Sequence, residues 1–186
     1  MSYRNGTYTA FYVDEPFIDG SSSVKKFDFC YFNLLKAWKS KDESFPFIDS
    51  HQKTYQVRDG SDFETTLVPR IRERLRNSKN IILFLSSHTK PSRALLEEIQ
   101  YGSIKLRLPI IIVYPEFETN AEIHTNGRLN SKTNMLIDKI PCLRKAMNIV
   151  PTAHILMNKN NISACINFSK LSVLTAENTF IYTYKD

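Results

Sequence analysis

The chain has 186 residues, the length of a single domain, and 42% of them are hydrophobic and 24% charged, as in an ordinary globular protein. No apolar run has the length of a membrane span, and the first residues lack a signal-peptide core, so we expect a cytoplasmic protein that makes no membrane contact. The net charge of +6 is not gathered in a basic tail, which argues against nucleic acid as the main partner.

The densest basic run, residues 70–79, places its charges mostly at two-residue spacing, which spreads them around a helix. We expect a solvated helix there, and a basic surface can also attract a phosphate-rich small molecule such as a dinucleotide. The three cysteines, Cys30, Cys142 and Cys165, are too few and too far apart for a disulfide framework or a zinc site. We expect free, buried thiols, and the spacing of the four histidines predicts no metal site.

In the first third of the chain, hydrophobic spacing predicts two strands and two helices. The strands are Tyr8–Val13 and Phe45–Ile48, and the first helix is Phe27–Trp38. A second helix begins after an N-cap at Ser61 or Asp62 and runs to about Arg76. Pro69 either kinks this helix or marks its true start.

The stretch Asn80–Pro115 reads as strand, helix and strand with little slack between them. Ile81–Leu85 and Leu108–Tyr114 are uniformly apolar, as parallel strands covered on both faces are. Between them, Ser92 is a plausible N-cap for a helix over Arg93–Lys105. The loop before this helix then lies at the carboxyl edge of the sheet, where α/β proteins bind ligands.

Two adjacent acids in this helix differ in their position around the helix axis. At about 100° per residue from Leu95, Glu97 falls nearly opposite the apolar stripe and is expected to be solvated. Glu98 falls on the border of the stripe, where a carboxylate can be half desolvated and still reach a ligand. The alternative is a structural glutamate paired with a neighbouring Lys or Arg.

The remainder, residues 117–186, is predicted to be a polar loop to residue 132 with a turn at Asn126-Gly127, followed by helices and strands. These elements are a helix over 133–148, a strand over 154–157, a short helix over 162–171 and a last strand over 179–184. The alternation predicts an α/β protein of the flavodoxin type, a doubly wound and mainly parallel sheet with helices on both faces. We expect one domain, 1–186, with a core over 1–116 and a C-terminal extension that ends in a strand.

Sequence motifs narrow the class further. The chain has no G-x-G-x-x-G, no P-loop and no G-x-S-x-G motif, which argues against a Rossmann dehydrogenase, a P-loop phosphotransferase and an α/β-hydrolase. Five segments instead resemble a TIR domain, most of all the bacterial TIR-like group of the Thoeris antiphage defence system. They are residues 8–13, 46–50, 74–86, 92–99 and 109–111, and the tail segments 150–155 and 182–185 also resemble that group.

The resemblance implies an enzyme that cleaves the nicotinamide glycosidic bond of NAD, with NAD as substrate and no further cofactor. The ADP-ribose part is then hydrolysed, or is cyclised or conjugated into a nucleotide signal that activates an effector. Glu98 matches the catalytic glutamate of the family by position. Because nicotinamide leaves as a neutral molecule, a lone carboxylate that stabilises an oxocarbenium-like ribose suits this chemistry.

Seven further residues are candidates for binding the substrate at the carboxyl edge, each with an alternative as strand-end packing, an Asx-turn or a cap. They are Phe11, Tyr12, Asp14, Asp49, His51, Ser86 and Ser92. Two positions depart from the family pattern. Ala94 stands where many relatives carry a Trp, which removes a stacking surface for NAD, and Tyr12 stands where a Ser is common in the first strand.

Three functions remain open from the sequence. The first is the NAD-consuming enzyme, with self-association among its implied properties. The second is a non-catalytic TIR-like module that assembles with other TIR domains or an effector, in which Glu98 is a structural ion-pairing residue. The third is another α/β nucleotide-binding protein, such as a nucleoside transferase.

Overall fold

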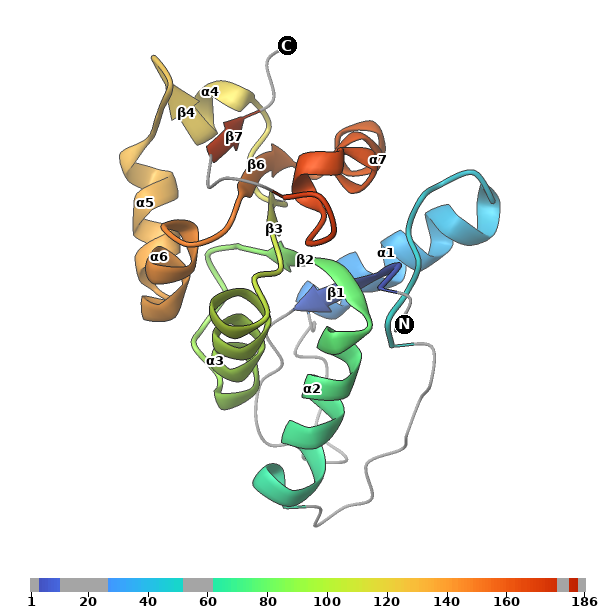
Figure 1. The fold of residues 1–186 in the computed structure, drawn as a ribbon. Coiled ribbons are helices and arrows are strands. Elements are labelled where there is room, and N and C mark those ends of the chain that lie inside the picture. The colour runs from blue at the N-terminus through green and yellow to red at the C-terminus, as the bar shows by residue number, and fades with distance from the viewer. Residues whose placement is uncertain (1–3, 11–26, 52–61, 177–180, 184–186) are drawn as a thin grey trace, which may run out of the picture.

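A computed structural model describes residues 4–10, 27–51, 62–176 and 181–183. Among these residues, five strands form one parallel sheet in the order β1-β2-β3-β6-β7 (Figure 1). The strands are β1 (Gly6–Ala10), β2 (Ser78–Phe84), β3 (Ile110–Tyr114), β6 (Thr152–Leu156) and β7 (Ile181–Thr183). The predicted parallel α/β sheet is therefore confirmed, and β7 confirms the predicted strand near the C-terminus.

The predicted strand Phe45–Ile48 is wrong, because this segment makes a single parallel bridge, between Asp49 and Thr7. The Thr7 amide donates to the carbonyl of Ile48 at 2.7 Å, and no longer ladder forms among the described residues. Pro46 has no amide hydrogen to extend such a ladder toward the N-terminus. The segment nevertheless lies beside β1 on the side away from β2, which is the position of the second strand in the flavodoxin order.

Helices cover both faces of the sheet, as predicted (Figure 1). On one face, α2 (Val68–Arg76), α3 (Arg93–Ile99), α5 (Ser131–Asp138) and α6 (Pro141–Met147) pack on alternate strand residues such as Tyr8, Leu83 and Ile112. On the other face, α1 (Phe27–Lys41) and α7 (Lys159–Asn167) pack on residues such as Phe84 and Val113. The two clusters explain why the central strands are uniformly apolar.

Two helices contain π-helical turns that hydrophobic spacing did not reveal. A π-helical turn over Phe63–Leu67, capped by the side chain of Asp62, precedes α2. Pro69 lies in the first turn of α2, so it marks the start of the α-helix and does not kink it. After α3, the helix continues as a π-helical turn over Gln100–Lys105.

The segment predicted as a polar loop up to residue 132 contains regular structure. It forms α4 (Asn120–Ile123) and the hairpin of β4 (His124–Thr125) and β5 (Arg128–Leu129), which pair antiparallel. Asn126 and Gly127 both have positive φ, which confirms the predicted turn and is typical of a two-residue hairpin loop.

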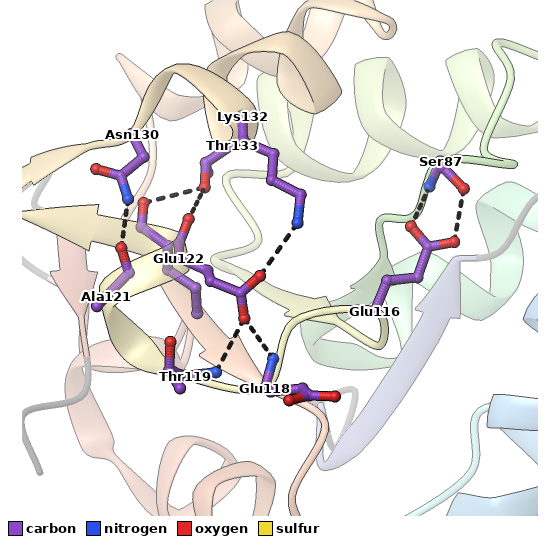
Figure 2. A network of polar contacts seen from close by, with 10 residues as sticks. Ser87, Glu116, Glu118, Thr119, Ala121, Glu122, Asn130, Lys132 and Thr133 are labelled. Atoms are coloured by element: carbon purple, nitrogen blue, oxygen red, sulfur yellow. Dashed lines mark hydrogen bonds and ion pairs between the residues drawn. The ribbon is translucent and has the colours of Figure 1, made fainter.

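Glu122 organises this segment (Figure 2). Its Oε2 accepts from the amides of Glu118 and Thr119 at 2.7 and 3.1 Å, and its Oε1 accepts from Lys132 at 3.1 Å. With the Thr119 side chain, these contacts form a capping box at the start of α4. Sequence spacing missed this order because the contacts join residues of a short polar stretch, in which hydrophobic periodicity is weak.

Three further differences concern the second half of the chain and the thiols. The helix predicted over 133–148 is two helices, because Pro141 begins α6 and cannot continue α5. The helix predicted over 162–171 ends at Asn167, and a short 3₁₀ turn follows over Ser169–Leu171. Cys30 is exposed, contrary to the expectation of buried thiols. Within the described ranges, no helix combines the length and apolar character needed to cross a bilayer.

We predict that Gly6→Ala loosens the segment at Asp49. A Cβ added at Gly6 would lie 2.5 Å from the Oγ of Ser50, which is hydrogen-bonded to the Oγ of Ser78 at 2.6 Å. Gly6→Ala should lower the free energy of unfolding by about 1–3 kcal/mol. Urea denaturation in a double-mutant cycle with Ser50→Ala is the measurement, and the loss should shrink in the Ser50→Ala background. Equal losses in both backgrounds would contradict this steric explanation.

Candidate active site

Glu98 and Tyr8 meet between α3 and the sheet, although 90 positions separate them in the sequence. The alternation of β1 turns Tyr8 toward the face covered by α2 and α3. Ser92 caps α3 by accepting from the amide of Leu95 at 3.2 Å, and Glu98 follows in the second turn. The Tyr8 hydroxyl donates to Oε1 of Glu98 at 2.7 Å.

Glu98 is a buried carboxyl group whose side chain has few polar contacts. The residue is 8% exposed, and its Oε2 has no hydrogen-bond partner among the described residues. Burial raises the pKa of Glu98 to about 8, against the opposing effects of the Tyr8 hydrogen bond and the positive charge of Arg74. The proton of the neutral acid can reside on Oε2, because Oε1 already accepts from Tyr8.

Glu97 has a different environment, and one expectation for it is wrong. Its side chain is 18% exposed, so it is not fully solvated, and it accepts from Nε of Arg72 at 2.6 Å. Arg72 also lies over the ring of Tyr101, 4.9 Å from its centroid. From the sequence, one alternative for Glu98 was an ion pair with a neighbouring Lys or Arg. Such an ion pair is made by Glu97 with Arg72, because α2 packs against this side of α3.

Asp49 and His51 lie against Tyr8. The His51 ring centroid is 4.6 Å from that of Tyr8 and 5.6 Å from that of Phe32. Oδ1 of Asp49 accepts from the amide of His51 at 2.8 Å and lies 3.1 Å from Nδ1 of its ring. Burial opposes ionisation of Asp49, but these contacts with His51 hold the pKa of Asp49 below its usual value. Asp49 thus makes the Asx-type turn that was its alternative assignment.

We expected Ser86 and Asp49 to lie together at the carboxyl edge of the sheet, but the structure separates them. Thr7 pairs with Asp49 on one side and with Asn80 on the other. Ser86 lies six residues beyond Asn80, about 20 Å at the rise of a strand. Ser86 is buried, and its amide donates to Oγ1 of Thr89 at 2.9 Å, so it shapes the loop before α3.

A carboxylate joins the loops that follow β2 and β3. The amide and the hydroxyl of Ser87 donate to the two carboxylate oxygens of Glu116 at 2.7 and 2.6 Å (Figure 2). Lys139 donates to the carbonyl of Ser87 from the start of the α5–α6 connection. These contacts fix the loop that leads through Ser92 into α3, and so fix the start of the helix that carries Glu98.

Three of the candidate residues, Phe11, Tyr12 and Asp14, lie outside the described residues. Ala94 is half-buried and packs against the core, so its small side chain has a packing role in α3.

Sequence reasoning missed Tyr8 as a site residue. The available signal was its position two residues before Ala10 in β1, which places a hydroxyl on the face that receives α3.

The arrangement brings a buried acid, a buried phenol and a His–Asp pair to one region of the sheet edge. A carboxylate in such surroundings can stabilise a developing positive charge strongly, because little water screens it. Among the residues that the structure describes, no group of three or more His, Cys, Asp or Glu side chains could hold a metal ion. The burial of Glu98 and its contact with Tyr8 suggest the chemistry of a single carboxyl group.

The parallel sheet of flavodoxin type and the glutamate on the helix after β2 are the features of a TIR-like domain. Comparison with protein families agrees, because residues 8–120 match the model of the TIR-like domain of Thoeris protein ThsB. The chain belongs to this family, the TIR-like proteins of the Thoeris antiphage defence system. The matched segment holds Tyr8, Asp49, His51 and Glu98, and the residues after it supply β6 and β7.

We predict that Glu98 makes stability depend on pH. An unfolded glutamate ionises near its ordinary pKa of 4.5, whereas folded Glu98 keeps its proton up to about pH 8. The contribution of Glu98 to stability is therefore complete below pH 4.5 and falls by about 1.4 kcal/mol per pH unit up to about pH 8. Urea unfolding of the wild-type protein between pH 4.5 and 8 should show this slope.

Glu98→Gln should remove this dependence of stability on pH, because glutamine keeps an oxygen that accepts from Tyr8 but does not titrate. Glu97→Gln is the matched control, and it should retain the slope while losing the ion pair with Arg72. If the wild-type protein and Glu98→Gln had parallel pH dependences, Glu98 would be ionised in the folded state.

Proposed function

We propose that the protein is an NAD-consuming enzyme that cleaves the bond between nicotinamide and ribose. In this proposal the product is an ADP-ribose-derived nucleotide signal, cyclic or conjugated, that activates an effector protein in antiphage defence. The observation that carries the proposal is the buried Glu98, held by Tyr8 through one oxygen and unpartnered among the described residues through the other. Membership of the ThsB TIR-like family supports it.

Glu98 suits the reaction for an electrostatic reason. The nicotinamide ring of NAD carries a positive charge and leaves as a neutral molecule, so the positive charge passes to the ribose in the transition state. A carboxylate beside the ribose stabilises this oxocarbenium-like state, as in glycosidases. The departure of a neutral leaving group needs no proton donor, so one ionised carboxyl group is sufficient for bond cleavage.

The resting protonation state of Glu98 then matters for binding. At pH 7 the free protein holds Glu98 mainly as the neutral acid, which can donate a hydrogen bond to a ribose hydroxyl. The positive nicotinamide ring favours the ionised form when it comes close. Binding of NAD is thus coupled to release of a proton from Glu98, and the charge appears where the reaction requires it.

Asp49 and His51 lie on the Tyr8 side of the site. Ser86 shapes the loop before α3, and Ser92 caps the start of that helix. Ala94 leaves out the Trp ring found in many relatives, so we infer weaker stacking on the substrate. Self-association is proposed from the family, with the effector reached through the diffusible product.

We predict that Glu98→Gln strongly reduces the release of nicotinamide. The purified protein, alone and in lysate from phage-infected cells, is mixed with NAD, and nicotinamide and new nucleotides are followed by mass spectrometry. Loss of the charge that stabilises the ribose should reduce turnover by about 100-fold or more. Glu97→Gln carries the same chemical change at the neighbouring position and should stay within a few-fold of the wild-type rate.

The product mass distinguishes hydrolysis from cyclisation or conjugation. Absence of nicotinamide release under both conditions would contradict the proposed enzyme. If Glu98→Gln then kept its self-association and partner binding, the protein would be an assembly module. Turnover of nucleosides in place of NAD would instead indicate a nucleoside transferase.

We predict that kcat/KM for NAD rises with pH and levels off above about 8. This parameter reports the free enzyme, in which Glu98 must lose its proton to act as a carboxylate. Below the midpoint the rate should rise about tenfold per pH unit. The midpoint of kcat should lie lower, because the positive ring of bound NAD favours the ionised form. A flat profile of kcat/KM from pH 6 to 9 would contradict this role of Glu98.

A further inference from the structure

We propose that Tyr8 is a positioning residue for Glu98, whose hydroxyl fixes Oε1 and thereby leaves Oε2 as the oxygen that meets the ribose of the substrate. This inference rests on the proposed function. It concerns Tyr8, which the sequence placed only in the first predicted strand.

The carboxyl group has two oxygens with different surroundings. Oε1 accepts from the Tyr8 hydroxyl at 2.7 Å, and Tyr8 itself is 1% exposed. Oε2 has no hydrogen-bond partner among the described residues. An unpartnered buried oxygen is unfavourable unless a ligand or water supplies a donor, and ribose hydroxyls are such donors. We therefore assign Oε1 to the contact with Tyr8 and Oε2 to the contact with the ribose.

The Tyr8 ring is itself held in place. His51 packs on it with the rings tilted by 46°, and Asp49 holds the His51 ring through Oδ1. The backbone around Asp49 is fixed to β1 by the bridge with Thr7. Ser50 adds a hydrogen bond to Ser78 at the start of β2. Asp49 and His51 are thus linked to Glu98 through Tyr8.

A positioning role differs from simple core packing in its effect on protonation. The Tyr8 hydroxyl stabilises the ionised form of Glu98, because a hydrogen bond to a charged acceptor is stronger than one to a neutral acceptor. Removing the hydroxyl while keeping the ring should therefore make Glu98 harder to ionise. A hydroxyl that only satisfied packing in the core would leave the titration of Glu98 unchanged.

The experiment compares Tyr8→Phe with Tyr114→Phe. Tyr114 is the matched control because its hydroxyl is also buried and is hydrogen-bonded, to Nδ1 of His154 at 2.8 Å. The Glu98 side-chain carboxyl carbon is followed by ¹³C NMR as a function of pH, with Glu98→Gln used to assign its signal. Tyr8→Phe should raise the midpoint by about one pH unit, and Tyr114→Phe should leave it in place.

Activity gives the second measurement. The midpoint of kcat/KM for NAD should move up with the NMR midpoint in Tyr8→Phe, so kcat/KM at pH 7 should fall about tenfold. Tyr114→Phe should keep the wild-type midpoint. An unchanged Glu98 midpoint in folded Tyr8→Phe would overturn the inference.

Two results keep this test separate from that of the proposed function. If the wild-type protein did not cleave NAD, the proposed function would fail, while the NMR midpoint would still decide whether Tyr8 fixes Glu98. If Tyr8→Phe did not fold, 3-fluorotyrosine at position 8 would take its place, because it keeps the ring and makes the hydroxyl a stronger donor. The Glu98 midpoint should then move down, and a midpoint equal to that of the wild type would overturn the inference.

Discussion

The site depends on how closely α3 and its π-helical continuation approach the sheet. A Cβ added at Gly102 would lie 2.6 Å from Cδ1 of Ile81 and 3.0 Å from Cδ2 of Leu75. A larger residue would hold the helix further from β2, and the contact of Glu98 with Tyr8 would lengthen. The close approach removes water from the carboxyl group, and burial is the main cause of its raised pKa. Packing thus creates the electrostatic property on which the proposed chemistry depends.

The outer edge of the sheet contributes in a different way. A single β-bridge at Asp49 takes the place of a second strand, and small residues permit a close fit there. Gly6 leaves room for Ser50, which links the edge segment, residues 45–50, to β2 through Ser78. The edge segment therefore gains its position from a few polar contacts and from the burial of Phe45 and Phe47, and not from a ladder of backbone hydrogen bonds.

The sequence was sufficient to predict the fold class and the position of Glu98 beside the apolar stripe, although Glu98 is more deeply buried than the half-desolvated position that we expected. The helical count worked because α3 is a regular α-helix up to Ile99. It does not describe Tyr101 and Ser103, which are buried in a π-helical turn with a different period. The hydrogen bond from Tyr8 could not be predicted, because it joins β1 to α3 across the fold, and neither hydrophobic spacing nor motif reading reports such a contact. The order around Glu122 was missed for a related reason, since it comes from side chains that cap backbone amides.

The π-helical turn over Gln100–Lys105 also bears on where the chain can change in length. Because each of its hydrogen bonds spans one residue more than in an α-helix, the turn can lose a residue by converting to α-helix. Such a deletion falls after Glu98 and leaves the carboxyl group on the same side of α3. A deletion of one residue between Ser92 and Glu98 would instead rotate the carboxyl group by about 100° relative to the helix start, away from Tyr8. Within this helix, length changes that preserve the site are thus expected on the C-terminal side of Glu98, whereas the spacing from Ser92 to Glu98 is fixed.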